Sequence, residues 1–136
     1  MKLSISQIID KHRALCEFAE KDIELPAQVA WNIDDNLDAF KRELEKFDSK
    51  RNKLINRLIE SGSAIVVDDG NRIVAATGRE EEFHASELQI NELLQVEVNV
   101  DVATISESDL PHELTIKDLH SLKFMVLRNQ NVNLKE

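Results

Sequence analysis

The most regular alternation of polar and apolar residues lies in residues 95–103, QVEVNVDVA. Valine fills every second position, and Glu97, Asn99 and Asp101 stand between the valines. A two-residue period is typical of a β-strand with one apolar and one polar face. The segment therefore predicts a strand that joins a sheet formed elsewhere in the chain and presents an acidic second face.

Two helical patterns precede this strand. The first covers about residues 4–22, where apolar residues recur at spacings of three and four and a serine near the start can cap the helix. The second covers residues 26–61, and Gly62 directly after it suits a helix C-terminus. Residues 1–62 therefore predict a long antiparallel helical hairpin.

The second helix is much longer than the first. At 1.5 Å per residue it spans about 54 Å against about 28 Å, so roughly half of it stays uncovered by its partner. Its apolar stripe follows heptad-like steps of four and three and includes Phe47, Leu54 and Leu58. Either the C-terminal part of the chain or another subunit must bury these residues, which makes them our candidates for self-association.

Residues 63–128 predict a smaller α+β region. The runs AIVVD and RIVAA flank the turn formers DDGN, which is typical of a β-hairpin. Residues 80–94 predict a third helix, and Thr115 with Asp118 can form the capping box of a last one. We expect the strand at 95–103 to complete a three-stranded sheet with the hairpin.

These elements predict one domain of the α+β class that is mainly helical. The 136 residues are enough to bury a core without disulfides or metal. The helical hairpin of residues 1–62 is followed in residues 63–128 by the small three-stranded sheet with two further helices. Residues 129–136 predict a polar tail.

The net charge of −9 is concentrated in one segment. Residues 79–113 hold ten acidic residues and one basic residue, whereas the rest of the chain is balanced. The segment would repel phosphates, so we do not expect direct nucleic-acid binding through it. Glu97 and Asp101 are instead candidates for contact with a basic protein surface, and the simpler interpretation is that the charge keeps the protein soluble.

The sequence predicts no catalytic, cofactor or metal site. Cys16 is the single cysteine, and the four histidines do not have the spacing of metal ligands. Phosphate-binding glycine motifs and the GxSxG elbow are also missing, so we expect no enzyme activity. With neither a signal-peptide pattern nor a membrane-spanning apolar run, the chain is expected to be cytoplasmic and not membrane-bound.

Three stretches carry a family resemblance: LPAQVAWNIDDNLDAF, ELQINELLQVEVNVDVATISESDLP and ELTIKDLHSLKFMV. They resemble a family of short uncharacterised proteins encoded by phages and prophages of bacteria. The resemblance implies a phage-derived origin and an action in the bacterial host cytoplasm or in association with the virion. It implies no activity and supplies no functional residues.

The first hypothesis is therefore a non-enzymatic phage or prophage accessory or structural protein that acts through protein–protein contact and self-associates through its second helix. The alternative is a small acidic inhibitor, such as an anti-defence protein, whose residues 79–113 occupy the basic nucleic-acid-binding site of a host factor. A third hypothesis, an enzyme, would require carboxylates and histidines that converge in a pocket.

Overall fold

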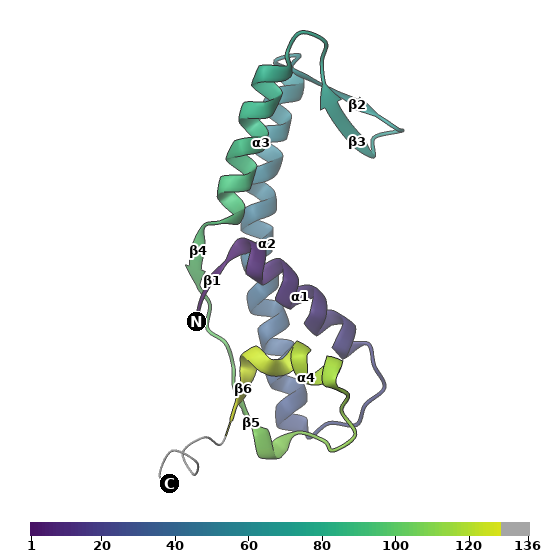
Figure 1. The fold of residues 1–136 in the computed structure, drawn as a ribbon, viewed down its shortest axis with the longest axis vertical. Coiled ribbons are helices and arrows are strands. Elements are labelled where there is room, and N and C mark those ends of the chain that lie inside the picture. Colours follow the sequence, from purple (N-terminus) through teal and green to yellow (C-terminus); the bar gives the residue numbers. More distant parts are fainter. Residues whose placement is uncertain (129–136) are drawn as a thin grey trace.

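The molecule is elongated and has two regions, a base and an arm. The structure is a computed structural model that describes residues 1–128; the tail predicted at 129–136 lies outside the described residues. Helix α2 (Ala27–Glu60) runs through both regions (Figure 1). We define the arm as residues 47–96 and the base as residues 1–46 and 97–128. Among the described residues, no helix has the length and apolar character needed to cross a membrane.

In the base, α1 (Ile5–Ala19) packs beside the first half of α2, and α4 (Ile116–Leu122) packs against α1. Ser4 caps α1, because its hydroxyl accepts from the Gln7 N–H at 3.1 Å and the Gln7 side chain accepts from the Ser4 N–H at 2.9 Å. The hairpin of α1 and α2 agrees with the sequence. Five large side chains are fully buried in this region: Ile8, Leu15, Phe40, Leu122 and Met125.

In the arm, α3 (Glu80–Leu94) lies along the second half of α2 (Figure 1). The β-hairpin of β2 (Ala64–Val67) and β3 (Arg72–Ala75) connects α2 to α3 and projects to one side of the helix pair at the distal end (Figure 1). Gly62 ends α2 as expected. Its φ is 76°, and the Ser63 N–H donates to the Leu58 carbonyl at 2.8 Å, which is the hydrogen bond of a Schellman cap.

The predicted three-stranded sheet is wrong. The strand expected at 95–103 is reduced to β4 (Glu97–Asn99), which pairs antiparallel with β1 (Lys2–Ser4), and the distal hairpin stays two-stranded. The reason is the length of α3: its 15 residues carry the chain about 22 Å away from the hairpin before β4 begins. The sequence predicted that the first helix begins near Ser4, and it did not predict the strand at Lys2–Ser4.

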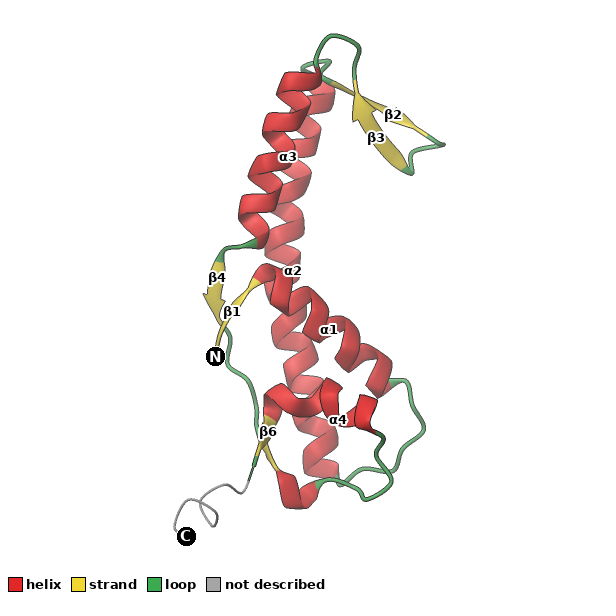
Figure 2. Cartoon of the chain, in the orientation of Figure 1, coloured by secondary structure: helices red, strands yellow, loops and turns green. Residues whose placement is uncertain are grey.

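The last helix is also shorter than the twelve-residue run IKDLHSLKFMVL (116–127) predicts. Thr115 and Asp118 form the predicted capping box of α4, but the helix ends at Leu122. The chain continues as a 3₁₀ turn, η2 (Lys123–Met125), and then as β6 (Val126–Leu127). Strand β6 pairs in parallel with β5 (Ile105–Ser106), which is followed in the chain by the 3₁₀ turn η1 (Glu107–Asp109). Figure 2 shows how short these strands are beside the helices.

Candidate functional site

The three residues proposed for self-association lie on the second half of α2, along which α3 runs. Phe47 and Leu58 are only 8% and 6% exposed, and Leu54 is half-buried. The C-terminal part of the same chain therefore covers much of the stripe that the sequence left uncovered. Surfaces available to a partner must be sought on either side of this helix pair.

One side of the helix pair carries a basic groove of about 440 Å³. Leu54 of α2 and Leu93 of α3 contribute its apolar lining, together with Val96 just after α3. One wall is basic, with Lys50, Lys53 and Arg57 of α2, and Glu92 of α3 is the acidic residue on the other. The groove is thus a basic surface on a chain with net charge −9.

The other side carries what we call the apolar seam, which consists of Ile55, Ile59, Phe83, Ile90 and Leu94. One residue along a helix is a rotation of about 100°, so Ile55 and Leu94 turn away from the groove that Leu54 and Leu93 line. Ile59 shares the face of Ile55 because it lies four residues on. Every member of the seam remains partly exposed.

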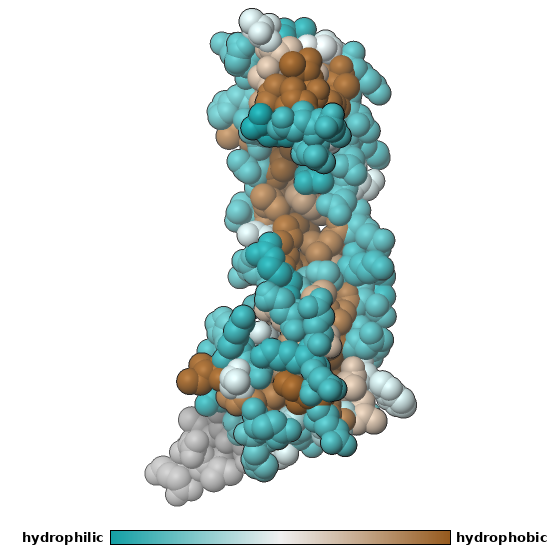
Figure 3. All heavy atoms as spheres, turned by 90° about the vertical axis from the view of Figure 1, so that its right-hand side faces the viewer, coloured by the Kyte–Doolittle hydropathy of each residue, from teal (hydrophilic) through white to brown (hydrophobic). Residues whose placement is uncertain are grey.

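The β2–β3 hairpin stands on the seam side of the arm. In Figure 3 its apolar side chains gather at the distal end, and an apolar strip continues along the arm below them. Ile65 is 51% exposed and Val66 is 50% exposed. Neighbouring residues of a strand point to opposite faces, so the chain itself fully covers neither face at this point.

The root of the hairpin is well anchored, in contrast to its tip. Ala64 and Ser63 are buried, and the Ala76 N–H donates to the Ser63 carbonyl at 2.9 Å. Arg79 also donates from Nη1 to the Ser61 carbonyl at 3.4 Å. The exposed apolar surface of Ile65 and Val66 therefore lies just beyond the anchored root of the hairpin and belongs to an ordered element.

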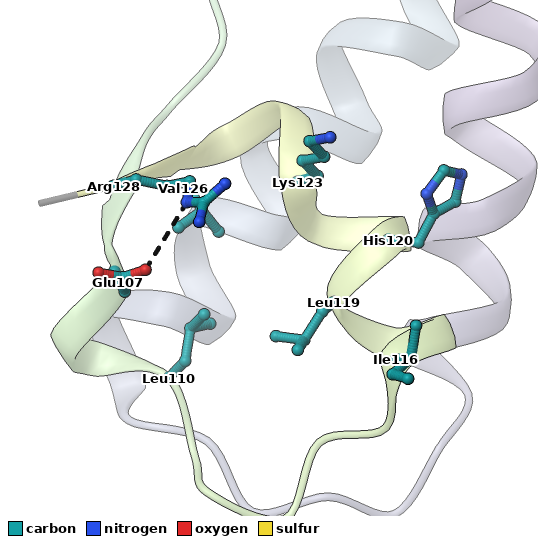
Figure 4. A pocket seen from close by; sticks show the side chains of 8 residues that line it. All are labelled: Glu107, Leu110, Ile116, Leu119, His120, Lys123, Val126 and Arg128. Atoms are coloured by element: carbon teal, nitrogen blue, oxygen red, sulfur yellow. Dashed lines mark ion pairs between the residues drawn. The ribbon is translucent and has the colours of Figure 1, made fainter. Parts of the chain in front are cut away.

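A further hollow, which we call the basal pocket, lies beside α4 and has a volume of about 350 Å³. Figure 4 shows Leu110 and Leu119 pointing toward the same space, with Ile116 at the edge. Ile116 is 87% exposed. His120 and Glu107 line the same pocket, but the Glu107 carboxylate pairs with Arg128 at 3.8 Å.

The two acidic candidate residues are exposed and lie apart from these apolar surfaces. Glu97 pairs with Lys2 across the β1–β4 ladder at 3.9 Å. Asp101 lines an acidic hollow of about 360 Å³ with Asp35 and Asp38 of α2. Carboxylates from two distant parts of the sequence therefore share one hollow, with Arg42 as the basic residue in its lining. The charge map of residues 79–113 did not include Asp35 and Asp38.

The buried carboxylate of Asp118 has a structural role. Asp118 accepts a hydrogen bond from the Lys21 ammonium and another from the Thr115 N–H at 3.1 Å. The Lys21 hydrogen bond first, and then the Thr115 N–H, lower the pKa of the Asp118 carboxyl from its usual value of 3.8. Across residues 1–128, no group of three or more histidine, cysteine or acidic side chains is arranged to hold a metal ion.

The structure confirms the predicted hairpin, but sequence reasoning missed its exposure, although a signal for it was present. Ile65, Val66 and Val67 are consecutive apolar residues, whereas a strand with one solvated face alternates. Such a run indicates that both faces of the strand are to be covered. Its position at the end of a projecting arm depends on the packing of α3 against α2, which the pattern does not contain.

Comparisons with known proteins add no relative. No family model, curated protein or solved structure matches this chain. The resemblance to phage and prophage proteins therefore stays a prediction.

Proposed function

We propose that this chain is a non-enzymatic phage or prophage accessory protein that acts through protein–protein contact and self-associates through its arm. Its place of action would be the host cytoplasm, or the virion if it assembles there. The observation that carries the proposal is the β2–β3 hairpin, where Ile65 and Val66 are half-exposed on opposite faces.

The β2–β3 hairpin is expected to gain stability from contact with a partner. A lone two-stranded hairpin is marginally stable in water and gains stability from packing against a helix or a further strand. Strand edges are usually protected by charges or proline, yet β2 reads AIVV and has neither. Apolar residues exposed together on an ordered element mark an interaction site.

The heptad-like stripe of α2 supports self-association less strongly in the structure than it did in the sequence. Leu58→Glu, combined with Leu54→Glu, is expected to unfold the arm because Leu58 is buried within the chain. That double variant cannot separate dissociation from unfolding. Substitutions on the hairpin can, because their side chains are already half in water.

The test is the mass in solution, measured by light scattering on a size-exclusion column over a range of micromolar concentrations. We expect the wild type to exceed the mass of one chain. Ile65→Lys with Val66→Lys is expected to give a monomer with an unchanged circular dichroism spectrum. Trp31→Lys is the matched control, since Trp31 is a large apolar residue of the base, 68% exposed, and its replacement should leave the mass unchanged. A monomeric wild type would refute self-association.

A second candidate function is supported by the acidic hollow. Asp35, Asp38 and Asp101 outnumber the one basic residue of the hollow, Arg42, and this net negative lining suits a basic partner, as an acidic inhibitor of a host nucleic-acid-binding protein would need. We expect the wild type to elute such proteins from a column of immobilised DNA, and to lose this effect in high salt. Glu97→Lys with Asp101→Lys should not elute them, whereas equal elution by both proteins would exclude this role.

A further inference from the structure

We infer that the β2–β3 hairpin of one protomer packs on the apolar seam of a second copy, and that the second copy returns the same contact about a two-fold axis. This inference rests on the proposed self-association and specifies its interface. The occupant of the seam is thus a named segment of an identical chain.

Both halves of this interface lie on the same side of the arm. The hairpin stands over the face of the helix pair on which the apolar strip runs (Figure 3). A two-fold contact is self-complementary, because each surface patch meets the patch of its partner. One docking event would therefore cover two hairpins and two seams, and it would leave no free end to recruit a third copy.

A single chain does not make this contact by itself. Ala64 is buried at the root, but Ile65 and Val66 remain half-exposed beyond it. Among seam residues, Ile59 is 37% exposed and Ile55 is half-buried. Apolar surface is therefore left on both the hairpin and the seam of one protomer, and a second copy holds the matching surface.

Each of the two surfaces has a basic and an acidic side chain at its edge, so that opposite charges can be paired between them. Arg51 lies four residues before Ile55 and thus borders the seam on α2. Glu87 lies between Phe83 and Ile90 at helical spacing and borders it on α3. The hairpin carries exposed Asp69 in its turn and exposed Arg72 at the start of β3.

Two of these charged residues, Arg72 and Glu87, already have local contacts that a partner can replace. Arg72 pairs with Asp68 at 3.2 Å, and His84 lies 3.8 Å from Glu87. Both pairs are between exposed side chains, which hold their geometry weakly. Pairing Asp69 with the partner's Arg51, and Arg72 with the partner's Glu87, would set the register of the two arms.

The basal pocket is the competing location for the hairpin. It also has an apolar lining and a basic edge, with Lys123 and Arg128. The pocket and the hairpin lie at opposite ends of the molecule (Figure 1), so that contact would be head-to-tail. A head-to-tail contact builds rings or open filaments, whereas the seam builds a closed dimer.

Chemical cross-linking between two single-cysteine variants tests the inference. Both variants carry Cys16→Ser to remove the native thiol. One has Val66→Cys on the hairpin, and the other has Ile55→Cys on the seam and a C-terminal tag that changes its mass. The two are mixed, left to exchange subunits, and treated with a short bismaleimide reagent.

We expect a mixed dimer band that contains one tagged and one untagged chain. Because each chain has one cysteine, no intrachain link can mimic this product. Val66→Cys mixed with tagged Trp31→Cys, both in the Cys16→Ser background, is the matched control and should give no mixed band. Val66→Cys mixed with tagged Leu119→Cys tests the basal pocket in the same way.

The outcomes separate the interface from the proposed function. A mixed band with Leu119→Cys and none with Ile55→Cys would overturn the inference in favour of head-to-tail contact. A dimeric mass in light scattering without any band to Ile55→Cys would also overturn it, while self-association would stand. A monomeric wild type would remove the proposed self-association and this inference with it.

Discussion

The base and the arm differ in whether they contain a fully buried apolar core. Among residues 1–128, the five largest fully buried side chains, including Phe40, all lie in the base, whereas none of the 15 residues of α3 in the arm is buried. The base therefore holds a core of its own. The arm exposes apolar side chains on ordered elements, and exposed apolar surface of this kind is typical of sites that bind a partner.

The largest expected effect comes from the centre of the base. Phe40 is fully buried, and its ring centroid lies 5.5 Å from that of Phe124. Phe40→Ala should lower the free energy of unfolding by about 3–5 kcal/mol, because it removes buried apolar contacts and leaves a cavity. Urea denaturation followed by circular dichroism measures this value.

The matched change in the arm is Leu88→Ala on α3, where the side chain is about half-exposed. Its effect should stay within about 0.5 kcal/mol. Equal losses for the two variants would contradict the division into a self-sufficient base and an incomplete arm.

Asn36 should have the next largest effect, because it fastens the 100–104 segment to α2. Its Nδ2 donates to the Ala103 carbonyl at 2.9 Å, and its Oδ1 accepts from the Ala103 N–H at 2.7 Å. Asn36→Ala should cost about 2 kcal/mol in urea denaturation, because it leaves both backbone groups without these partners. Asn32→Ala is the control: it removes exposed hydrogen bonds with Thr104 and Gln28 and should cost much less. Equal costs would show that the buried anchor has no special weight.

The ion pair between Lys21 and Asp118 predicts a pH dependence confined to the base. The pKa of Asp118 is lowered in the folded chain, so its contribution to stability is present above the unfolded pKa of about 3.9 and is lost as the pH falls through the folded value. The difference in unfolding free energy between wild type and Asp118→Asn should therefore shrink as urea denaturation is moved from neutral pH to below pH 4. Asp10→Asn, at an exposed pair with Arg13, should show little difference at any pH.

The outline of the helices could be predicted because local chemistry fixes their ends. The structure places α2 at Ala27–Glu60, within one residue at each end of the predicted 26–61, since Pro26 and Gly62 act on the chain directly beside them. The predicted third helix, residues 80–94, has the same bounds as α3. The partner of β4 could not be predicted, because it depends on where the end of α3 lies in space.

The candidate site was predictable to a smaller extent for the same reason. The heptad-like stripe identified Phe47 and Leu58 as residues that need cover, but not that α3 of the same chain provides it. Ile65 and Val66 belong to a run whose pattern predicts a hairpin whether its side chains are exposed or covered. Exposure is a property of the packed molecule, so only the structure separates the residues that remain for a partner.

The smallest expected effect concerns the hairpin turn and tests whether the arm opens independently of the base. Gly70 has a φ of 90°, and a Cβ added there would meet no heavy atom within 4 Å. Gly70→Ala should therefore cost about 1 kcal/mol through backbone conformation alone.

Hydrogen exchange in native conditions measures where this cost appears. Amides paired between β2 and β3 should exchange about fivefold faster in Gly70→Ala, because their protection follows local opening, while the amides of α1 should keep their rates. Asn71→Ala in the same turn is the control, as Asn71 is not among the residues with positive φ. If α1 accelerated together with the hairpin, the two regions would unfold as one unit, and the exposed arm could not be treated as a separable surface held out by a stable base.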